Sequence, residues 1–378
     1  MRKASTRPLR ILAPTRYPWR FNSPRHSRHA ITNQPFLPMN KIDERIEGFT
    51  IFPPTLRRYD LVHAFNRIPV GRTPYLIGFE SHLPRAFSLE STAYFRTLTK
   101  SLAGKRCRGI VAISRFSERI FRKMHAESAM AEELYEKLEM RYPNIEIPAV
   151  EDQAPDLNGP LQLVFVGHHF ARKGGCVAVR LAELAQEAGV DMRITIVSGL
   201  AMGGDIWTDP AREEYYETWA DRLERGTITH HPSLPNEQVQ TLLRGAHFCL
   251  LPTFGDTFGY SAIEAMANHC PMIATRQGAL PEFIEDDSNG ILLDLPVDGD
   301  GDWIHSSSPD RDTPGFERMF TDEIERLAET ALTRVVGYLN NPARYRDLRN
   351  EARRTVETTF AASDANEFWD RRYEEAVG

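Results

Sequence analysis

Short apolar runs rich in Val, Ile and Leu recur along the chain, and a loop and an amphipathic stretch follow each of them. An apolar run without polar alternation is typical of a strand buried on both faces of a parallel sheet. The amphipathic stretches have the spacing of helices that pack on such a sheet. The repeated order of strand, loop and helix predicts an α/β protein built of Rossmann-like units. In such units, ligands bind beside the carboxyl ends of the strands.

The most complete unit of this kind spans residues 247–293. Its first apolar run ends at Pro252, and the glycine-containing loop 253–259 leads into a short apolar helix that we expect Ser261 to cap. Glu264 is the only charged residue of that helix. Because a buried carboxylate costs several kcal/mol unless it is paired, we expect Glu264 to contact either a protein group or a ligand hydroxyl.

A second strand-to-helix turn begins with an apolar run from Leu161 that ends at Gly167. The loop 168–175 carries Arg172 and Lys173 next to two glycines. Two adjacent cations at such a turn suit a diphosphate, because Arg can bind two oxygens and Lys supplies a compact charge. The amide groups at the helix N-terminus add favourable dipoles. The alternative is that both residues are surface cations on a loop.

The first part of the chain follows the same pattern and ends in a linker. Prolines and polar residues gather between residues 143 and 160, so we place a domain boundary near residue 155. Ser114 has the position of a helix N-cap, and the charged stretch 131–140 is predicted to be helical. The other elements predicted before the boundary are strands at 10–13, 48–52, 61–64, 75–79 and 109–113 and helices at 93–103 and 116–124.

Composition narrows the class of protein. With 378 residues, 41% hydrophobic and 26% charged, the chain is long enough for two soluble globular domains. It has no apolar run of transmembrane length and no secretory signal pattern. Its four cysteines have no metal-ligand spacing, so we expect reduced thiols in a cytoplasmic protein. The net charge of −6 argues against a general nucleic-acid binder.

The charge distribution singles out the N-terminus. Residues 1–42, here called the basic block, contain arginines, lysines and histidines but no acid. Such a block attracts phosphate or carboxylate groups. It is therefore a solvated basic arm, a contact for an acidic acceptor, or a peripheral contact with an anionic membrane surface.

The unit at 247–293 resembles a known family. Asp256, seven intervening residues and Glu264, followed by Ala265-Met266-Ala267, resemble the E-x7-E signature of glycosyltransferase family 4. The resemblance extends from about residue 161 to the C-terminus and more faintly over residues 59–122. The chain departs from the family in its Asp at the first acidic position and in lacking a Gly-rich loop after the first strand. A further departure is His168, where many relatives have Arg.

The resemblance implies the GT-B fold, in which two Rossmann-like domains face each other. Residues 1–155 would form the acceptor-side domain, and residues 156–345 would form the domain that binds the nucleotide sugar. Residues 346–378 would form C-terminal helices. The last of these would pack back on the first domain through an apolar stripe of Phe368, Trp369 and Tyr373.

The resemblance also implies transfer of a sugar from a nucleoside-diphosphate sugar to an acceptor hydroxyl, with retention and without a metal or other cofactor. The acceptor would be a glycan, a lipid-linked compound or a small molecule, in glycan or glycoconjugate synthesis. Asp256 would hold the sugar hydroxyls and Glu264 the ribose hydroxyls. The diphosphate would be bound by Gly167, Arg172, Lys173, Thr257, Phe258 and Gly259.

On the acceptor side, Glu80 and His82 stand where relatives usually have a histidine. His63 belongs to a strand that resembles the D-x-V-H strand of the family. A structural hydrogen-bonding role is the alternative to a catalytic role for each of these three residues.

The polar segment 297–315 interrupts the pattern of the second domain. Its aspartates imitate the metal-binding D-x-D motif of the other glycosyltransferase fold. No strand leads into them, however, so we expect a solvated surface insertion that holds no metal. The aspartates in question are Asp298, Asp300 and Asp302.

Two other functions remain open. A sugar-nucleotide epimerase of the same fold would use the cleft without an acceptor, but the basic block and the acidic pair favour transfer. A catalytically weak protein that binds nucleotide sugars would fit the departures from the family motifs.

Overall fold

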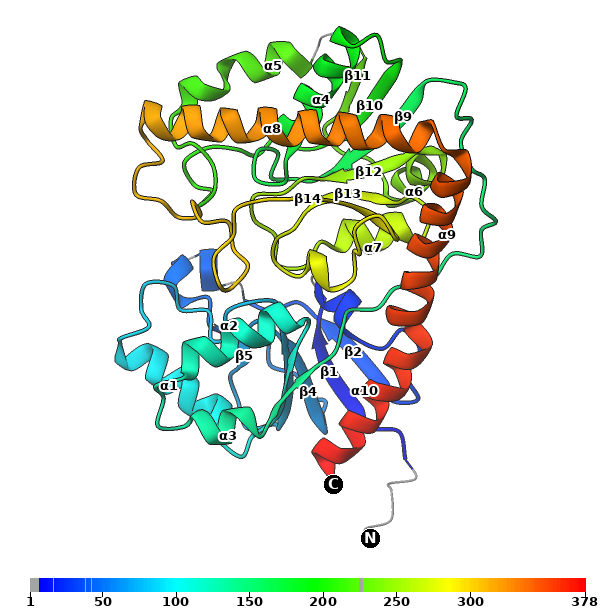
Figure 1. Ribbon diagram of the computed structural model, residues 1–378. Coiled ribbons are helices and arrows are strands. Elements are labelled where there is room, and N and C mark those ends of the chain that lie inside the picture. Colours follow the sequence, from blue (N-terminus) through cyan, green and yellow to red (C-terminus); the bar gives the residue numbers. More distant parts are fainter. Residues whose placement is uncertain (1–6, 16, 38, 42, 224–226) are drawn as a thin grey trace. The chain divides into compact units, whose positions relative to one another are not determined.

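The computed structural model describes residues 7–15, 17–37, 39–41, 43–223 and 227–378 (Figure 1). Parts of the basic block, including Arg16, lie outside these residues. The chain divides into two compact units. The first unit comprises residues 1–146 with 359–378, and the second unit comprises residues 147–358. The sequence places the boundary near 155, inside the proline-rich stretch that begins the second unit.

The first unit is built on a six-stranded parallel sheet with the order β2-β1-β4-β6-β7-β8. Buried apolar side chains from its central strands form the core, as the apolar runs predict. A separate two-stranded sheet pairs β3 with β5. The strands are β1 (Arg10–Pro14), β2 (Ala30–Gln34), β3 (Phe49–Thr50), β4 (Leu61–Phe65), β5 (Ile68–Pro69), β6 (Tyr75–Phe79), β7 (Cys107–Ala112) and β8 (Leu138–Met140).

Two predictions for the first unit need correction, and the edge strand β2 was missed. The strand expected at 48–52 is only the two-residue β3, and it lies outside the main sheet. The edge strand β2 is partly polar, so the search for apolar runs missed it. The helix expected over 131–140 ends as α3 (Ala131–Tyr135), and β8 follows it. Residues 138–140 have a helix-compatible sequence, but pairing with β7 overrides that weak preference.

The other helices of the first unit agree closely with the sequence pattern. Helix α1 (Ala93–Ala103) has the predicted bounds, and Ser114 caps α2 (Arg115–His125) by accepting a hydrogen bond from the backbone N–H of Ser117 at 3.0 Å. Helix α10 (Ala362–Val377) packs on this sheet. Its Trp369 and Tyr373 are buried in a cluster with apolar side chains of β1, β4, β6 and β7.

Deleting residues 365–378 should strongly lower the melting temperature. The deletion exposes the apolar face that Trp369 and Tyr373 cover, and burial of each large side chain contributes roughly 2 kcal/mol. Differential scanning calorimetry of the truncated chain measures the loss. The exposed Arg371 of the same helix offers a control, because Arg371→Ala should leave the melting temperature unchanged. A truncated chain as stable as the full chain would show that α10 does not hold this unit together.

The second unit contains another six-stranded parallel sheet, with the order β11-β10-β9-β12-β13-β14. Together the two parallel sheets confirm the predicted α/β class. The strands are β9 (Leu161–Val166), β10 (Met192–Val197), β11 (Ile228–His231), β12 (Phe248–Leu251), β13 (Met272–Thr275) and β14 (Gly290–Leu293). The helices are α4 (Gly175–Glu187), α5 (Glu217–Leu223), α6 (Asn236–Gly245), α7 (Tyr260–Met266), α8 (Pro314–Leu339) and α9 (Pro342–Thr359).

The segment 297–315 is anchored and is not the solvated insertion that its composition predicts. Trp303 is only 2% exposed and packs against Phe254 and Phe320. The segment also ends earlier than predicted. Thr313 caps α8, and Pro314 occupies the first turn of that helix, where the absence of an N–H costs nothing. Trp303 therefore anchors a segment whose other residues are mostly polar. No helix among the described residues is long and apolar enough to span a membrane.

Candidate functional site in the second unit

The order of the second sheet identifies where a ligand is expected. The chain runs from β9 outward through β10 to β11, then returns to the other side of β9 and continues from β12 to β14. The connections therefore reverse direction between β9 and β12, and open α/β sheets bind ligands beside the carboxyl ends of the strands at such a point. The loops that follow β9 and β12 are residues 167–174 and 252–259.

Two glycines shape the loop after β9. A Cβ atom on Gly167 would lie 2.8 Å from Cδ of Lys173, so this glycine lets the lysine side chain cross the end of the strand. Gly174 has φ +88°, and a side chain there would collide with the backbone of Pro252. The two loops consequently pack backbone against backbone. The carbonyl oxygen of Arg172 accepts hydrogen bonds from the backbone N–H of Phe254 and the hydroxyl of Thr253.

Lys173 and Asp256 meet across this junction. The Lys173 Nζ atom donates to Asp256 Oδ2 at 2.6 Å, and the two side chains are 19% and 11% exposed. Burial acts to raise the pKa of Asp256, but the charges of Lys173 and Arg172 and a hydrogen bond from Lys173 outweigh it, so the pKa is lowered. Asp256 is therefore an ionised carboxylate that shares a confined site with an ammonium group.

Arg172 is directed differently from Lys173. Its Nη1 atom donates to the carbonyl oxygen of Gly255 at 2.5 Å, and its guanidinium lies 4.8 Å from the centre of the Trp207 ring. The side chain is buried, and in this arrangement it supports the loop that carries Asp256. Its charge still contributes to the site. Burial, followed by the charges of Arg172, His168 and Lys173, lowers the pKa of His169 to about 4. The cations of this loop therefore act on His169 as well as on Asp256.

Trp207 was not singled out by the sequence pattern. It is 46% exposed, and it lies on the loop after β10 beside Gly255. The segment 297–315 fixes this loop: the backbone N–H of Ser307 donates to the carbonyl oxygen of Trp207, and Arg311 binds the carbonyl oxygens of Gly204, Ile206 and Asp209.

Other contributors that sequence reasoning missed are Thr253 and Gln277, which hydrogen-bond the backbone of this region. Their residue types carry no signal of this role.

The loop 257–259 leads directly into α7. Thr257, Phe258 and Gly259 lie between Asp256 and the helix, and Gly259 with φ +87° occupies the N-cap position. The expectation that Ser261 caps the helix is wrong, since Ser261 lies inside α7 and its buried hydroxyl has no hydrogen-bond partner among the described residues. Gly259 supplies no side-chain cap, and the Asp256 carboxylate accepts a hydrogen bond from the backbone N–H of Phe258 just before the helix.

Glu264 lies on the partly exposed side of α7. Its Oε1 atom is 3.5 Å from the amide nitrogen of Asn236, the first residue of α6. A protein group therefore contacts this carboxylate, and its side chain remains partly accessible.

The candidate acceptor residues belong to the first unit and follow the carboxyl end of β6. Glu80 Oε2 accepts hydrogen bonds from Asn66 at 2.9 Å and Arg85 at 3.0 Å. Burial, followed by the charge of Arg85, lowers the pKa of His82, whose Nδ1 lies 3.3 Å from the hydroxyl of Ser81. Glu80 is thus held by hydrogen bonds to Asn66 and Arg85, whereas the His82 ring is held only by its contact with Ser81.

His63 is buried far inside the first unit. It is 0% exposed, and its Nδ1 forms a hydrogen bond of 2.7 Å with the hydroxyl of Tyr373 in α10. Burial lowers its pKa to about 3, so the imidazole is neutral at physiological pH. A structural hydrogen-bonding role for His63, the alternative to a catalytic role, explains these contacts.

The aspartates of the segment 297–315 form a backbone turn. One carboxylate oxygen of Asp298 accepts hydrogen bonds from the backbone N–H groups of Asp300, Gly301 and Asp302. Within the part of the chain that the structure describes, no three His, Cys, Asp or Glu side chains are grouped so that they could hold a metal ion.

Comparisons with known proteins match the part of the chain that contains these two loops. Residues 160–300, which contain both loops, match the family model of glycosyl transferases group 1. The D-inositol 3-phosphate glycosyltransferase of Arthrobacter sp. is 29% identical over 138 residues, which are 36% of this chain and 31% of that protein. The protein of the same name from Corynebacterium kroppenstedtii is 30% identical over 150 residues, or 39% and 33% of the two chains. The match thus spans about a third of these relatives.

Solved structures show the fold over a longer stretch. Anabaena HepE in complex with UDP-glucose has a TM-score of 0.56 at 11% identity, over 95% of this chain and 98% of that chain. A glycosyltransferase from Rickettsia africae has a TM-score of 0.54 at 15% identity, over 84% and 77%. The structural neighbours are GT-B glycosyltransferases. Residues 160–300 therefore match the family model of glycosyl transferases group 1, and the chain has the GT-B fold.

Proposed function

We propose that the protein transfers a sugar from a nucleoside-diphosphate sugar to an acceptor hydroxyl, with retention of anomeric configuration. The contact between Lys173 and Asp256 carries this proposal. In a nucleotide sugar, the anomeric carbon is bonded directly to the diphosphate. A cation for the diphosphate and a carboxylate for the sugar hydroxyls must therefore lie side by side, and Nζ and Oδ2 are 2.6 Å apart.

The charges that develop in the reaction match these groups. As the bond to the diphosphate breaks, the leaving group gains negative charge and the sugar ring gains positive charge. Lys173 and the backbone N–H groups of Thr257 and Gly259 would stabilise the diphosphate. Asp256 would hold the sugar hydroxyls close to the developing positive charge. Arg172 keeps Gly255, and with it Asp256, in place.

Glu264 would bind the ribose hydroxyls of the donor. A carboxylate accepts hydrogen bonds from two neighbouring hydroxyls without changing its protonation state. Asn236, which already contacts Glu264, would then hold the carboxylate in position. Retention rests on the family resemblance, and proton nuclear magnetic resonance of the newly formed glycosidic bond tests it directly.

A panel of nucleotides identifies the donor. UDP, GDP, ADP and CMP should be compared by thermal shift, with UDP first because the solved Anabaena HepE structures contain UDP and UDP-glucose. A ligand at a hundred times its Kd adds about 2.7 kcal/mol to the free energy of unfolding. One nucleotide should raise the melting temperature in the wild type and much less in Lys173→Ala. No shift with any of them would speak against a donor site here.

Chelation of metal ions should leave turnover unchanged. The Asp298 carboxylate already accepts hydrogen bonds from backbone N–H groups. The proposed ligands of the diphosphate are a lysine and backbone amides, not a metal ion. Turnover should be measured after dialysis against EDTA and again after adding magnesium or manganese. If activity disappears on chelation and returns with either ion, a metal takes part and the assignment of the diphosphate ligands is wrong.

A further inference from the structure

The segment that precedes α8, residues 297–313, reaches the edge of the second sheet where the candidate site lies. It contacts the loops that follow β10, β12 and β13. Because these strands are parallel, their loops meet at the carboxyl edge of the sheet, which also carries Lys173 and Asp256. The composition of the segment predicts a solvated insertion, so its attachment at this edge calls for a function.

Arg311 attaches the segment to the loop after β10. Its guanidinium donates to the carbonyl oxygens of Gly204, Ile206 and Asp209, at 3.1 Å for Gly204 and 2.9 Å for Asp209. The backbone N–H of Ala211 donates to the carbonyl oxygen of Arg311 at 2.8 Å. A planar guanidinium presents several donors in a fixed geometry, so it can bind these oxygens together. Arg311 therefore holds residues 204–211 in one conformation.

The loop held by Arg311 carries Trp207, which contacts the site. Its ring lies 4.8 Å from the Arg172 guanidinium, and the backbone N–H of Ser307 donates to its carbonyl oxygen at 2.7 Å. A Cβ atom on Gly255 would lie 3.4 Å from Nε1 of Trp207, so the indole packs directly against this glycine. Arg172 in turn donates to the carbonyl oxygen of Gly255, the residue before Asp256. A continuous line of contacts thus leads from the segment to the Asp256 loop.

A second attachment reaches the Asp256 loop from Trp303. The rings of Trp303 and Phe254 lie 5.0 Å apart, and Phe254 is two residues before Asp256. The carbonyl oxygen of Gly301 also accepts a hydrogen bond from the backbone N–H of Gly278 at 2.9 Å. A Cβ atom on Gly278 would lie 2.2 Å from the carbonyl oxygen of Asp256, so the two backbones are in contact. The segment therefore supports Asp256 from both neighbouring loops.

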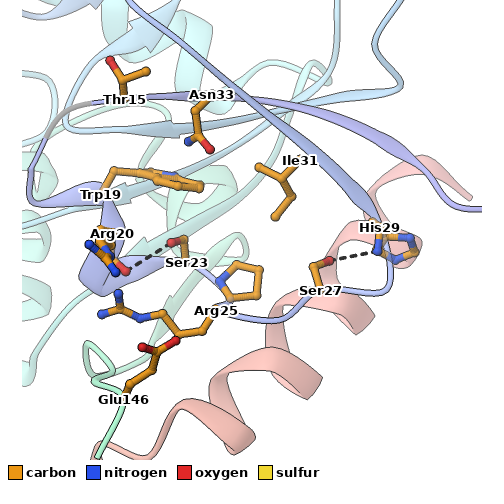
Figure 2. A pocket seen from close by; sticks show the side chains of 11 residues that line it. Thr15, Trp19, Arg20, Ser23, Arg25, Ser27, His29, Ile31, Asn33 and Glu146 are labelled. Atoms are coloured by element: carbon orange, nitrogen blue, oxygen red, sulfur yellow. Dashed lines mark hydrogen bonds between the residues drawn. The ribbon is translucent and has the colours of Figure 1, made fainter.

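The first unit holds a loop in a comparable way. The connection between β1 and β2 lines a polar pocket of about 520 Å³, and α10 passes beside it (Figure 2). From α10, Asn366 accepts hydrogen bonds from the backbone N–H groups of Arg25 and His26, and Asp370 accepts one from that of Arg28. In each unit, side chains from a later part of the chain thus bind the backbone of a loop that follows a strand.

We propose that residues 297–313 position Asp256 for the transfer reaction, and that Arg311 and Trp207 are the positioning residues through which they act. The proposal rests on the function proposed above. An error of about 1 Å in the position of a reacting group costs roughly a hundredfold in rate. Asp256 is carried by a loop, so its position depends on what holds that loop. Arg311 acts at a distance, because its hydrogen bonds go to residues 204–209 and reach Asp256 only through Trp207 and Arg172.

Steady-state kinetics test whether the two residues act along one line. Arg311→Gln and Trp207→Ala should each lower kcat about tenfold. The double variant should be no slower than Trp207→Ala alone, because residues that act through each other are not additive. Trp207→Phe keeps a ring over Arg172 and should lose less than Trp207→Ala. Arg318→Gln, which removes an exposed cation of α8, should match the wild type. Wild-type kcat in both single variants, or losses that add in the double variant, would overturn the proposal.

Amide hydrogen exchange tests the positioning without any substrate. The backbone N–H groups of Phe254 and Gly255 donate to the Arg172 carbonyl oxygen and the Thr253 hydroxyl. Exchange in the peptide that spans residues 252–258 should rise about fivefold in Arg311→Gln and in Trp207→Ala, since a loop that opens more often protects its amides less. Arg318→Gln should leave this exchange unchanged. Because Trp207 is 46% exposed, its variants fold and carry the test even if Arg311→Gln does not.

The two readouts separate this proposal from the proposed function. Unchanged exchange over residues 252–258 in the folded variants would show that the segment does not position the Asp256 loop, whatever the protein catalyses. If the exchange rises as expected but the wild type consumes no nucleotide sugar, the segment does hold the loop and the transfer reaction is wrong.

Discussion

Replacing Lys173 with Ala lowers kcat by roughly a hundredfold if this lysine stabilises the departing diphosphate. One preorganised donor aimed at developing charge is worth about 3 kcal/mol in the transition state. Gly167 leaves room for the Lys173 side chain at the carboxyl end of β9, and Asp256 holds its ammonium there. Steady-state kinetics with saturating donor and acceptor measure the change.

Two further variants separate this role from a purely structural ion pair. Lys173→Ala leaves the Asp256 carboxylate without its ammonium partner, so stability falls as well as turnover. Combining Lys173→Ala with Asp256→Asn relieves that penalty and should restore the melting temperature but not kcat. Arg193→Ala, which removes an exposed cation from the same unit, should change neither quantity. If the double variant regained wild-type turnover, Lys173 would serve only to neutralise Asp256.

Asp256→Ala should cost about 2–4 kcal/mol of transition-state stabilisation, seen mainly in kcat. Asp is one methylene shorter than the Glu of the signature that the sequence resembles, so if Asp256 holds the sugar its loop must lie further inward. The loop is held by Arg172 at Gly255 and by Gln277, whose amide donates to the carbonyl oxygen of Asp256 at 2.9 Å. Asp256→Glu should therefore also lose activity. The longer side chain would crowd the sugar, because the loop is held in place and cannot move outward.

Asp256→Asn distinguishes the sugar-binding role from an anchoring role. Asn keeps the size and one accepting oxygen but loses the charge that faces the sugar ring. We expect kcat to fall by about tenfold, since hydrogen bonds to charged groups are roughly twice as strong as neutral ones. Calorimetry should accompany the kinetics for the Ala, Asn and Glu variants. If Asp256→Ala kept the wild-type kcat and only lowered the melting temperature, Asp256 would serve only to hold Lys173 in place.

The sequence predicts the parts of this site that local patterning controls. Buried parallel strands are continuous apolar runs, so β9, β12 and β13 are recognisable without any tertiary information. The loop glycines are equally informative, because close backbone approach at Gly174 leaves no room for a side chain. The sequence therefore predicts both strand-to-helix turns of the site, whereas the pairing of β9 with β12 is seen in the structure.

Features that depend on distant partners could not be predicted. Arg172 and Lys173 are adjacent in sequence, yet Lys173 binds the Asp256 carboxylate and Arg172 binds the Gly255 backbone. The different orientations of these two side chains depend on packing against Trp207, whose loop is fixed by Arg311. Likewise, the sequence of residues 138–140 does not show whether they continue helix α3 or form strand β8. Pairing with β7 determines that they form a strand.

The most direct test measures release of nucleoside diphosphate from a panel of nucleotide sugars by the wild type and Lys173→Ala. The account predicts that the wild type releases one nucleoside diphosphate, that an acceptor increases its release, and that Lys173→Ala slows it roughly a hundredfold. Release that Lys173→Ala leaves unchanged, or no consumption of any nucleotide sugar with or without acceptor, would contradict the assignment of the site between β9 and β12.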